Sequence, residues 1–254
     1  MKFALGALFT ALLLTGAAQA ASPLDLYEQG KYNAAIASGI AQNDSVGFAI
    51  AARAEMAAEA MRAAPCIECI QRAQDDARKA IAADPKNPDG HVFLAVALGR
   101  EGRLLSAFTT VRRGYPAKAK EELDAALAAD PNNAFAWAAL GGWNIEIVRA
   151  GGARLGHMMY GASLADGFTD FDKAFAEAPD NVGLRYQYAL TLSAYDVDTY
   201  RKAVEDALTR AQNGKANGAY ESFVQTRAKE LLAALHKGDM DAYAALVSRD
   251  QGNP

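Results

Sequence analysis

Apolar residues recur along most of the chain at the spacing of an amphipathic helix. Within residues 71–83, Ala73, Ala77, Ala80 and Ile81 follow an i, i+4, i+7, i+8 pattern, which places them on one face of a helix. Runs of Val, Ile and Thr that are typical of strands are absent. The pattern predicts an all-α protein.

One sequence motif occurs three times, in residues 80–99, 126–143 and 174–190. Each copy has an alanine-rich stretch, a proline, an asparagine soon after it, and then an aromatic or aliphatic helix start. The residue before a proline is disfavoured in the α region, so the first helix ends there. A short polar side chain then caps the next helix. We therefore expect helix, tight turn and helix at Pro85 and Asn87, at Pro131 and Asn133, and at Pro179 and Asn181.

Large and small residues alternate at fixed places around these turns. The helices after the turns carry Trp137-x-x-Leu140-Gly141, His91-x-x-Leu94-Ala95 and Arg185-x-x-Tyr188-Ala189. The helices before the turns carry Ala73/Ala77/Ala80, Ala119/Leu123/Ala126 and Gly167/Phe171/Ala174. These residues resemble the tetratricopeptide (TPR) repeat. The resemblance implies an all-α, TPR-like array of antiparallel helical hairpins with a concave binding groove.

The prolines are 46 and 48 residues apart, whereas a TPR unit has about 34 residues. The extra chain must lengthen helices or form insertions, the second of which is the glycine-rich segment 147–167. This layout of long units resembles the central part of the regulator of microtubule dynamics proteins over about residues 70–195. We do not extend that resemblance to microtubule function, because the chain is acidic and is predicted to be exported.

The ends of the chain are weaker copies of the repeat. Residues 26–35 resemble a turn between two helices, and residues 45–61 predict a long alanine-rich helix. Two or three helices follow Tyr200, and the last amphipathic one would cap the array. We expect a single domain over residues 21–248, with the clearest repeats at about 66–195, and a disordered tail over residues 249–254.

The first twenty residues read as a cleavable signal peptide. Lys2 precedes an apolar run over residues 3–14, and Ala18-Gln19-Ala20 is an A-x-A site, so we expect cleavage after Ala20 and export to the periplasm or beyond. An uncleaved anchor is the alternative, which the short apolar run disfavours. The net charge is −4 for the full chain, and its charges are interspersed, which predicts neither nucleic-acid nor anionic-lipid binding.

Two cysteines form the motif Cys66-Ile67-Glu68-Cys69 after Pro65. A local disulfide is the first interpretation in an oxidising compartment. Small core residues, thiol–disulfide exchange and metal binding are the alternatives. Exchange lacks the βαβ context of a thioredoxin-like motif, and the sequence offers only three histidines as further zinc ligands. We predict no metal and no cofactor.

Residues suited to catalysis are not arranged in a known motif. The sequence contains no G-x-S-x-G, no H-E-x-x-H and no phosphate-binding loop, so we predict a protein that is not an enzyme. His157 lies beside Met158 and Met159, which would suit copper, but methionines commonly fill gaps between helices. We therefore expect these three side chains to pack between helices rather than to bind copper.

In TPR proteins the first helix of each hairpin lines the groove, and matching positions here predict a partner-binding surface. Its candidate residues are Arg100, Phe135, Glu146, Arg149 and Tyr186. Aromatic residues and arginine dominate binding hot spots, although Phe135 and Tyr186 could instead pack against the 147–167 insertion. We expect an exported scaffold that binds a protein or peptide. The alternatives are a small-molecule carrier whose insertion covers a pocket, and a thiol-redox protein.

Overall fold

The computed structural model describes residues 21–252, and every regular element in that range is an α-helix, as the sequence predicts. The predicted signal peptide and its cleavage site lie outside the described residues. The helices are α1 (Pro23–Glu28), α2 (Tyr32–Gln42), α3 (Ser45–Ala60), α4 (Ile67–Ala83), α5 (Pro88–Leu104), α6 (Ala107–Arg112), α7 (Tyr115–Ala129), α8 (Ala134–Gly151), α9 (Ala153–Tyr160), α10 (Leu164–Glu177), α11 (Val182–Asn213), α12 (Ala219–Lys237) and α13 (Met240–Gln251).

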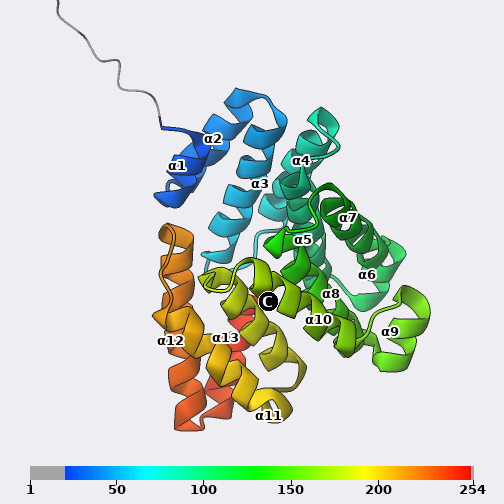
Figure 1. Cartoon of the computed structure of the whole chain (residues 1–254), viewed down its shortest axis with the longest axis vertical. Coiled ribbons are helices and arrows are strands. Elements are labelled where there is room, and N and C mark those ends of the chain that lie inside the picture. The colour runs from blue at the N-terminus through cyan, green and yellow to red at the C-terminus, as the bar shows by residue number, and fades with distance from the viewer. Residues whose placement is uncertain (1–20, 253–254) are drawn as a thin grey trace, which may run out of the picture.

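Successive long helices pack against one another in chain order, as Figure 1 shows. The most extensive contacts join α2 to α3, α3 to α4, α4 to α5, α5 to α7 and α8 to α10. Small residues make these contacts close: Ala73, Ala77 and Ala80 of α4 have no exposed surface. Short side chains at the contact allow two helix axes to approach, so the alanine stripe seen in the sequence becomes the packing face.

The three predicted turns have the expected capping geometry. Asp84, Asp130 and Ala178 leave the helical region, with ψ of 104°, 95° and 72°. The side chains of Asn87, Asn133 and Asn181 then accept hydrogen bonds from backbone amides in the first turn of α5, α8 and α11. These bonds satisfy donors that a helix start leaves without an intrahelical partner, so the predicted asparagine caps are confirmed.

The extra chain in each long unit forms one short helix. Helix α6 stands between α5 and α7, and α9 stands between α8 and α10, so a unit has two long helices and a short one. Both short helices lie at the right-hand margin of Figure 1 and carry exposed apolar side chains. Phe108 of α6 is 76% exposed and Met158 of α9 is 73% exposed.

Helix α11 contains a sharp bend. Asp196 has φ −166° and ψ 88°, and Tyr200 is also non-helical, so the element consists of two helical halves. A Cβ added at Gly214, just after the second half, would lie 2.8 Å from Val182 at the start of the first half. The chain therefore reverses at residues 196–200, and α11 is itself a helical hairpin.

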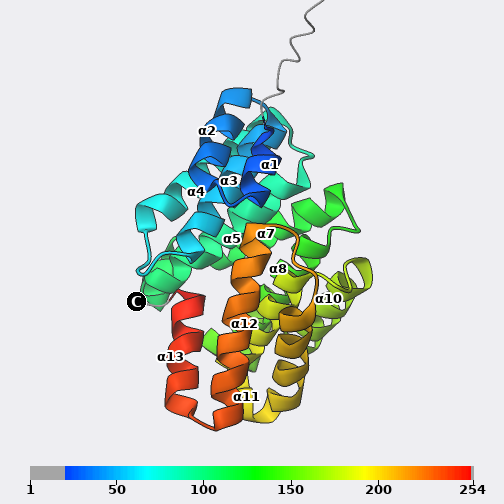
Figure 2. The same cartoon turned by 90° about the vertical axis from the view of Figure 1, so that its left-hand side faces the viewer.

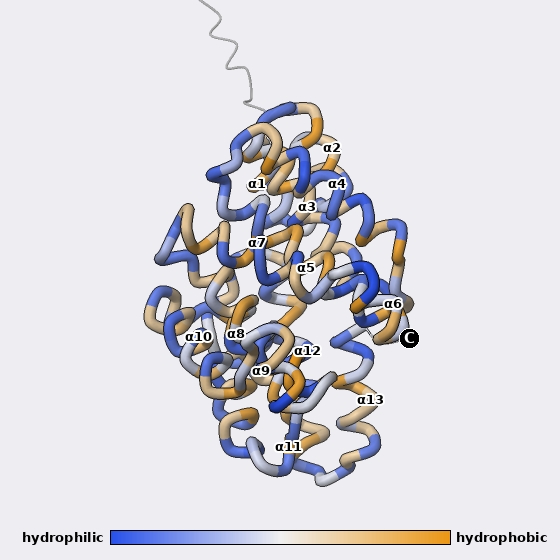
Figure 3. The backbone as a smooth tube through the Cα atoms, turned by 90° about the vertical axis from the view of Figure 1, so that its right-hand side faces the viewer, coloured by the Kyte–Doolittle hydropathy of each residue, from blue (hydrophilic) through white to orange (hydrophobic). Residues whose placement is uncertain are grey.

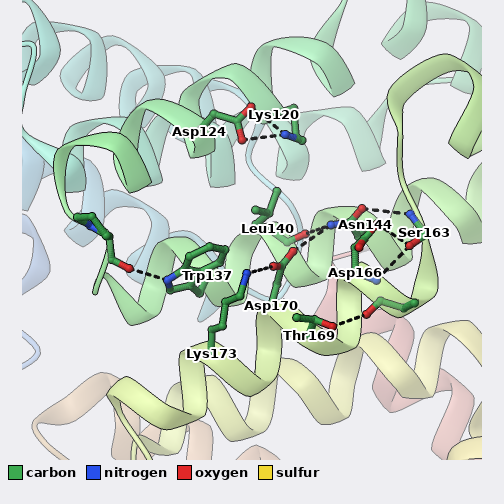
Figure 4. Close-up of polar contacts among 12 residues, drawn as sticks. Lys120, Asp124, Trp137, Leu140, Asn144, Ser163, Asp166, Thr169, Asp170 and Lys173 are labelled. Atoms are coloured by element: carbon green, nitrogen blue, oxygen red, sulfur yellow. Dashed lines mark hydrogen bonds and ion pairs between the residues drawn. The ribbon is translucent and has the colours of Figure 1, made fainter.

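Helices α8 and α10 pack at a glycine contact and share a buried polar network, which Figure 4 shows. A Cβ added at Gly141 would lie 2.7 Å from the Phe171 ring and 2.9 Å from the Gly167 carbonyl oxygen. Asn144 donates to the Asp170 carboxylate at 3.1 Å. Burial raises the pKa of Asp170, while nearby Lys173 lowers it. The network fixes the register of the two helices.

The C-terminal helices close the array. Ala219 at the start of α12 lies against Gly30 in the turn between α1 and α2, and Tyr220 packs on the apolar cluster around Tyr27. Figure 2 shows α12 rising beside α13 toward the N-terminal helices. Within residues 21–252, no helix is both long and apolar enough to span a membrane.

The predicted disordered tail is wrong for the residues that the structure describes. Helix α13 continues to Gln251, and Gln251 and Gly252 are buried. The reason is tertiary: Asp250 and Gln251 find polar partners on other helices, which the local sequence could not indicate.

Candidate functional site

The last turn of α13, residues Arg249–Gly252, contacts α5, α11 and α12. The Tyr186 hydroxyl on α11 donates to Asp250 Oδ2 at 2.5 Å. The Arg100 guanidinium on α5 donates to the Gln251 carbonyl oxygen. Two of the five residues predicted to bind a partner, Arg100 and Tyr186, therefore meet the same segment of the chain itself. We call this region, lined by Glu59, Arg100, Tyr186 and Arg227, the inner groove.

The Asp250 carboxylate is surrounded by polar groups, with 6% of its side chain exposed. Besides the Tyr186 hydroxyl, Arg249 Nε lies 2.7 Å and Arg227 Nε lies 3.6 Å from Asp250 Oδ1. Burial and the adjacent Asp250 carboxylate both raise the pKa of Tyr186, so its hydroxyl remains a donor at neutral pH. The inner groove thus recognises a carboxylate with one hydroxyl and one arginine from other helices.

Arg100 is held in place by a bidentate ion pair. Its Nε donates to Glu59 Oε2 at 2.9 Å and its Nη2 donates to Glu59 Oε1 at 3.0 Å. Glu59 lies in α3 and its side chain is 1% exposed. Because two parallel bonds fix the guanidinium plane, its remaining nitrogen Nη1 points at the carbonyl of Gln251.

Glu146 and Arg149, two further predicted binding residues, pair with each other within α8. Arg149 Nε and Nη2 donate to Glu146 at 2.9 and 2.6 Å. Burial lowers the pKa of Arg103, and the Glu146 carboxylate opposes that effect, so Arg103 of α5 lies near this pair. Arg103 Nε is buried and has no hydrogen-bond partner within the described part of the chain. The pair therefore borders an arginine whose hydrogen bonding is incomplete.

Phe135 lies at the start of α8, on the N-terminal side of the array. Its ring is 40% exposed, and the Arg53 guanidinium of α3 lies 5.6 Å from its centroid. The same guanidinium lies 4.5 Å from the Tyr27 ring. Phe135 is therefore separate from the Arg100–Tyr186 pair. Its ring packs against Arg53 of α3 rather than against the 147–167 insertion.

The last turn of α13 separates two cavities that share Ala60. The larger has a volume of about 340 Å³ and is lined by Glu59, Arg62, Arg100, Ser248 and Arg249, among others. The smaller, of about 60 Å³, includes Tyr186, Leu190, Phe223, Arg227 and Asp250. Neither is lined by residues 147–167. The open space of the inner groove thus lies on both sides of the chain segment that occupies it.

The remaining candidate residues of the sequence lie elsewhere. Cys66 and Cys69 form a disulfide at the start of α4, beside Pro65 at the rim of the larger cavity. His157, Met158 and Met159 lie in the exposed helix α9, which is at the front of the view in Figure 3. Over residues 21–252 no three His, Cys, Asp or Glu side chains are grouped as a metal site would require.

A sequence model of the regulator of microtubule dynamics protein 1-3 family matches residues 48–236, nearly three quarters of the chain. The chain belongs to this family. No individual curated protein matches the sequence. The family match supports the resemblance that we drew from the long repeat units, and it extends that resemblance into α3 and α12.

The part that matches the regulator of microtubule dynamics family contains the walls of the inner groove but not its occupant. Glu59, Arg100, Tyr186 and Arg227 all lie within residues 48–236. Helix α13 begins at Met240, after the match has ended. The groove therefore belongs to the family domain, whereas the segment that fills it lies outside the matched residues.

Sequence reasoning missed three residues of the site, namely Glu59, Arg227 and Asp250. Glu59 sits in an alanine-rich helix and has no motif of its own. Arg227 lies on α12 beyond the recognisable repeats, and Asp250 falls in the segment predicted to fray. A single signal could have found Glu59: an acid among small residues must have a partner if it is buried.

Proposed function

We propose that this protein is a non-enzymatic, TPR-like scaffold that binds a protein or peptide partner in its inner groove. The observation that carries the proposal is the position of α13: Arg100 and Tyr186, chosen from repeat phase as binding residues, contact the last turn of that helix. A groove that holds a polypeptide segment of its own chain has the shape and the donors to hold one from another chain.

The chemistry of the groove supports the same proposal. The groove presents arginine and tyrosine, the residue types that dominate interface hot spots. Glu59, an acid of the groove, is engaged in an ion pair with Arg100 rather than free as a general acid or base. Binding is therefore favoured over catalysis.

We place the protein in the periplasm or outside the cell. The leader motif of residues 1–20 supports export, and the Cys66–Cys69 disulfide fits an oxidising compartment. A small-molecule pocket covered by residues 147–167 is not favoured, because these residues line neither of the two cavities.

A capture experiment with matched variants tests the proposal. The bait is the full chain, used as wild type, as Arg62→Ser in the larger cavity of the inner groove, and as Phe108→Ser on α6. Both residues are exposed, so both variants should keep the wild-type melting temperature. We expect a specific envelope protein to be recovered by the wild type and by Phe108→Ser, but not by Arg62→Ser. Equal recovery by all three baits, or none by any, overturns the proposal.

A further inference from the structure

The last turn of α13 differs in character from the rest of the helix. Tyr243 and Val247, in the first two turns, are 1% and 6% exposed, and the Tyr243 hydroxyl lies 2.5 Å from Ser193 Oγ. After Val247 the side chains are polar, and the contacts of Asp250 and Gln251 are hydrogen bonds and ion pairs. Helix α13 thus has an apolar anchor and a polar tip.

This division allows the tip to open while the anchor stays in place. Unwinding residues 249–252 exposes no large apolar side chain, whereas undocking the whole helix would expose Tyr243 and Val247 to water. The groups released by the tip are charged or polar and can be solvated. Local unfolding at this end of the molecule therefore requires the least free energy when it is confined to the tip.

The tip also leaves a donor of the groove without a hydrogen bond. Arg227 Nε is buried and has no hydrogen-bond partner among the described residues, although Asp250 Oδ1 lies only 3.6 Å away. A buried donor without a partner is costly, and a carboxylate placed closer to it would satisfy it.

We propose that the inner groove binds a helical peptide segment with an acidic residue in its last turn, and that this segment displaces the last turn of α13. The proposal rests on the proposed function and names its partner class. The acidic side chain takes the place of Asp250 between Tyr186 and Arg227, and a free main-chain carbonyl takes the place of the Gln251 carbonyl at Arg100. The tip of α13 is the intramolecular competitor.

The position of the two cavities fits this exchange. They meet α13 from opposite sides, at Arg249 and Gly252 in one and at Asp250 in the other. Withdrawal of residues 249–252 would join them into one groove walled by α3, α5, α11 and α12. A helix end would then contact both Arg100 and Tyr186, as the tip does now.

The test uses the full chain and one fluorescent peptide with the sequence of residues 240–252, MDAYAALVSRDQG. Binding is followed by fluorescence anisotropy. The protein variant Asp250→Asn weakens the tip, so we expect it to bind the peptide about tenfold more tightly than the wild-type protein does. Asp241→Asn, an exposed change in the same helix, is the matched control and should bind as the wild type does.

A second peptide carries Asn in place of the aspartate that corresponds to Asp250, and we expect it to bind the Asp250→Asn protein about tenfold more weakly. Hydrogen exchange provides a measurement that does not depend on any variant. In the wild type, the amides of residues 249–252 should exchange about tenfold faster than those of residues 243–247.

Equal affinity of the wild-type and Asp250→Asn proteins for the peptide would overturn the inference, as would equal affinity for the two peptides or uniform exchange along α13. If the capture experiment still recovers a partner that is lost with Arg62→Ser, then the scaffold function stands and only the displacement of the tip is wrong.

Discussion

The indole nitrogen of Trp137 donates a hydrogen bond of 2.8 Å to the carbonyl oxygen of Pro131, six residues earlier. A hydrogen bond to the proline carbonyl oxygen also occurs at the other two turns, with a different donor side chain at each. His91 Nε2 lies 3.0 Å from the Pro85 carbonyl oxygen, and Arg185 donates to the Pro179 carbonyl oxygen at 3.0 and 3.2 Å. The shared feature of the repeat is thus a nitrogen donor that closes the turn, whatever residue supplies it.

Replacing Trp137 by Phe should lower the free energy of unfolding by about 1–2 kcal/mol, because the Pro131 carbonyl loses a partner and the ring shrinks. Lys173 Nζ also lies 3.8 Å from the Trp137 ring centroid, a contact that Phe would weaken. Urea unfolding measures the change. Phe108→Leu on the surface is the control, and equal midpoints for the two variants would show that the turn link is not stabilising.

Gly141→Ala should destabilise the protein by about 1–3 kcal/mol, because the new methyl group overlaps Phe171 and the Gly167 backbone. Gly99 offers the matched control: it is exposed within α5, and a Cβ added there meets no atom within 4 Å. Gly99→Ala should stabilise by about 0.5–1 kcal/mol, since alanine favours the helix. The two melting temperatures should therefore move in opposite directions, and a common direction would contradict the close contact of α8 and α10.

Stability should depend on pH through Glu55. Burial raises the pKa of this α3 carboxyl to about 7, against a lowering by its hydrogen bond from Arg72, and Glu55 Oε2 has no partner among the described residues. Between pH 4.5, the ordinary pKa, and pH 7, the folded state holds a proton that the unfolded chain has released. The free energy of unfolding contributed by this group therefore falls as the pH rises through that window.

Glu55→Gln should remove this dependence, and at pH 8 it should be more stable than the wild type by about 1–2 kcal/mol. Unfolding midpoints measured at pH 5 and pH 8 provide the test. Glu68→Gln, an exposed change nearby, should leave the pH profile as it is. A Glu55→Gln profile parallel to that of the wild type would refute the assignment.

Removing the disulfide with Cys66→Ser and Cys69→Ser together should cost about 2 kcal/mol, the loop-entropy estimate for so short a loop. Serine at position 66 can still accept the hydrogen bond that Cys66 Sγ now receives from the Cys69 amide. The loss should therefore reflect the cross-link rather than the cap, and it should match the effect of adding a reductant to the wild type. If the free energies of unfolding of the variant and of the reduced wild type differ by more than the error of the unfolding curves, that explanation is excluded.

Local sequence was sufficient for the turns and the helix faces. The proline–asparagine turns, the buried stripe of Ala73, Ala77 and Ala80, and the small residue at Gly141 could be read directly, because capping and helical periodicity depend on near neighbours. The repeat phase also selected Arg100 and Tyr186, which the structure brings to one segment of the chain. Of its three other choices, Glu146 and Arg149 pair with each other, and Phe135 lies beside Arg53.

The local sequence could not predict that the last turn of α13 occupies the inner groove. Asp250 lies 64 residues from Tyr186, and Gln251 lies 151 residues from Arg100. Nothing in the local pattern at Arg249–Gly252 distinguishes a frayed end from a buried one, because the side chains there are polar and their partners come from α5, α11 and α12. The sequence by itself determined the helices, their caps and the faces they bury. Only the tertiary structure decided that α5, α11 and α12 meet the last turn of α13, because that depends on how all the preceding helices pack.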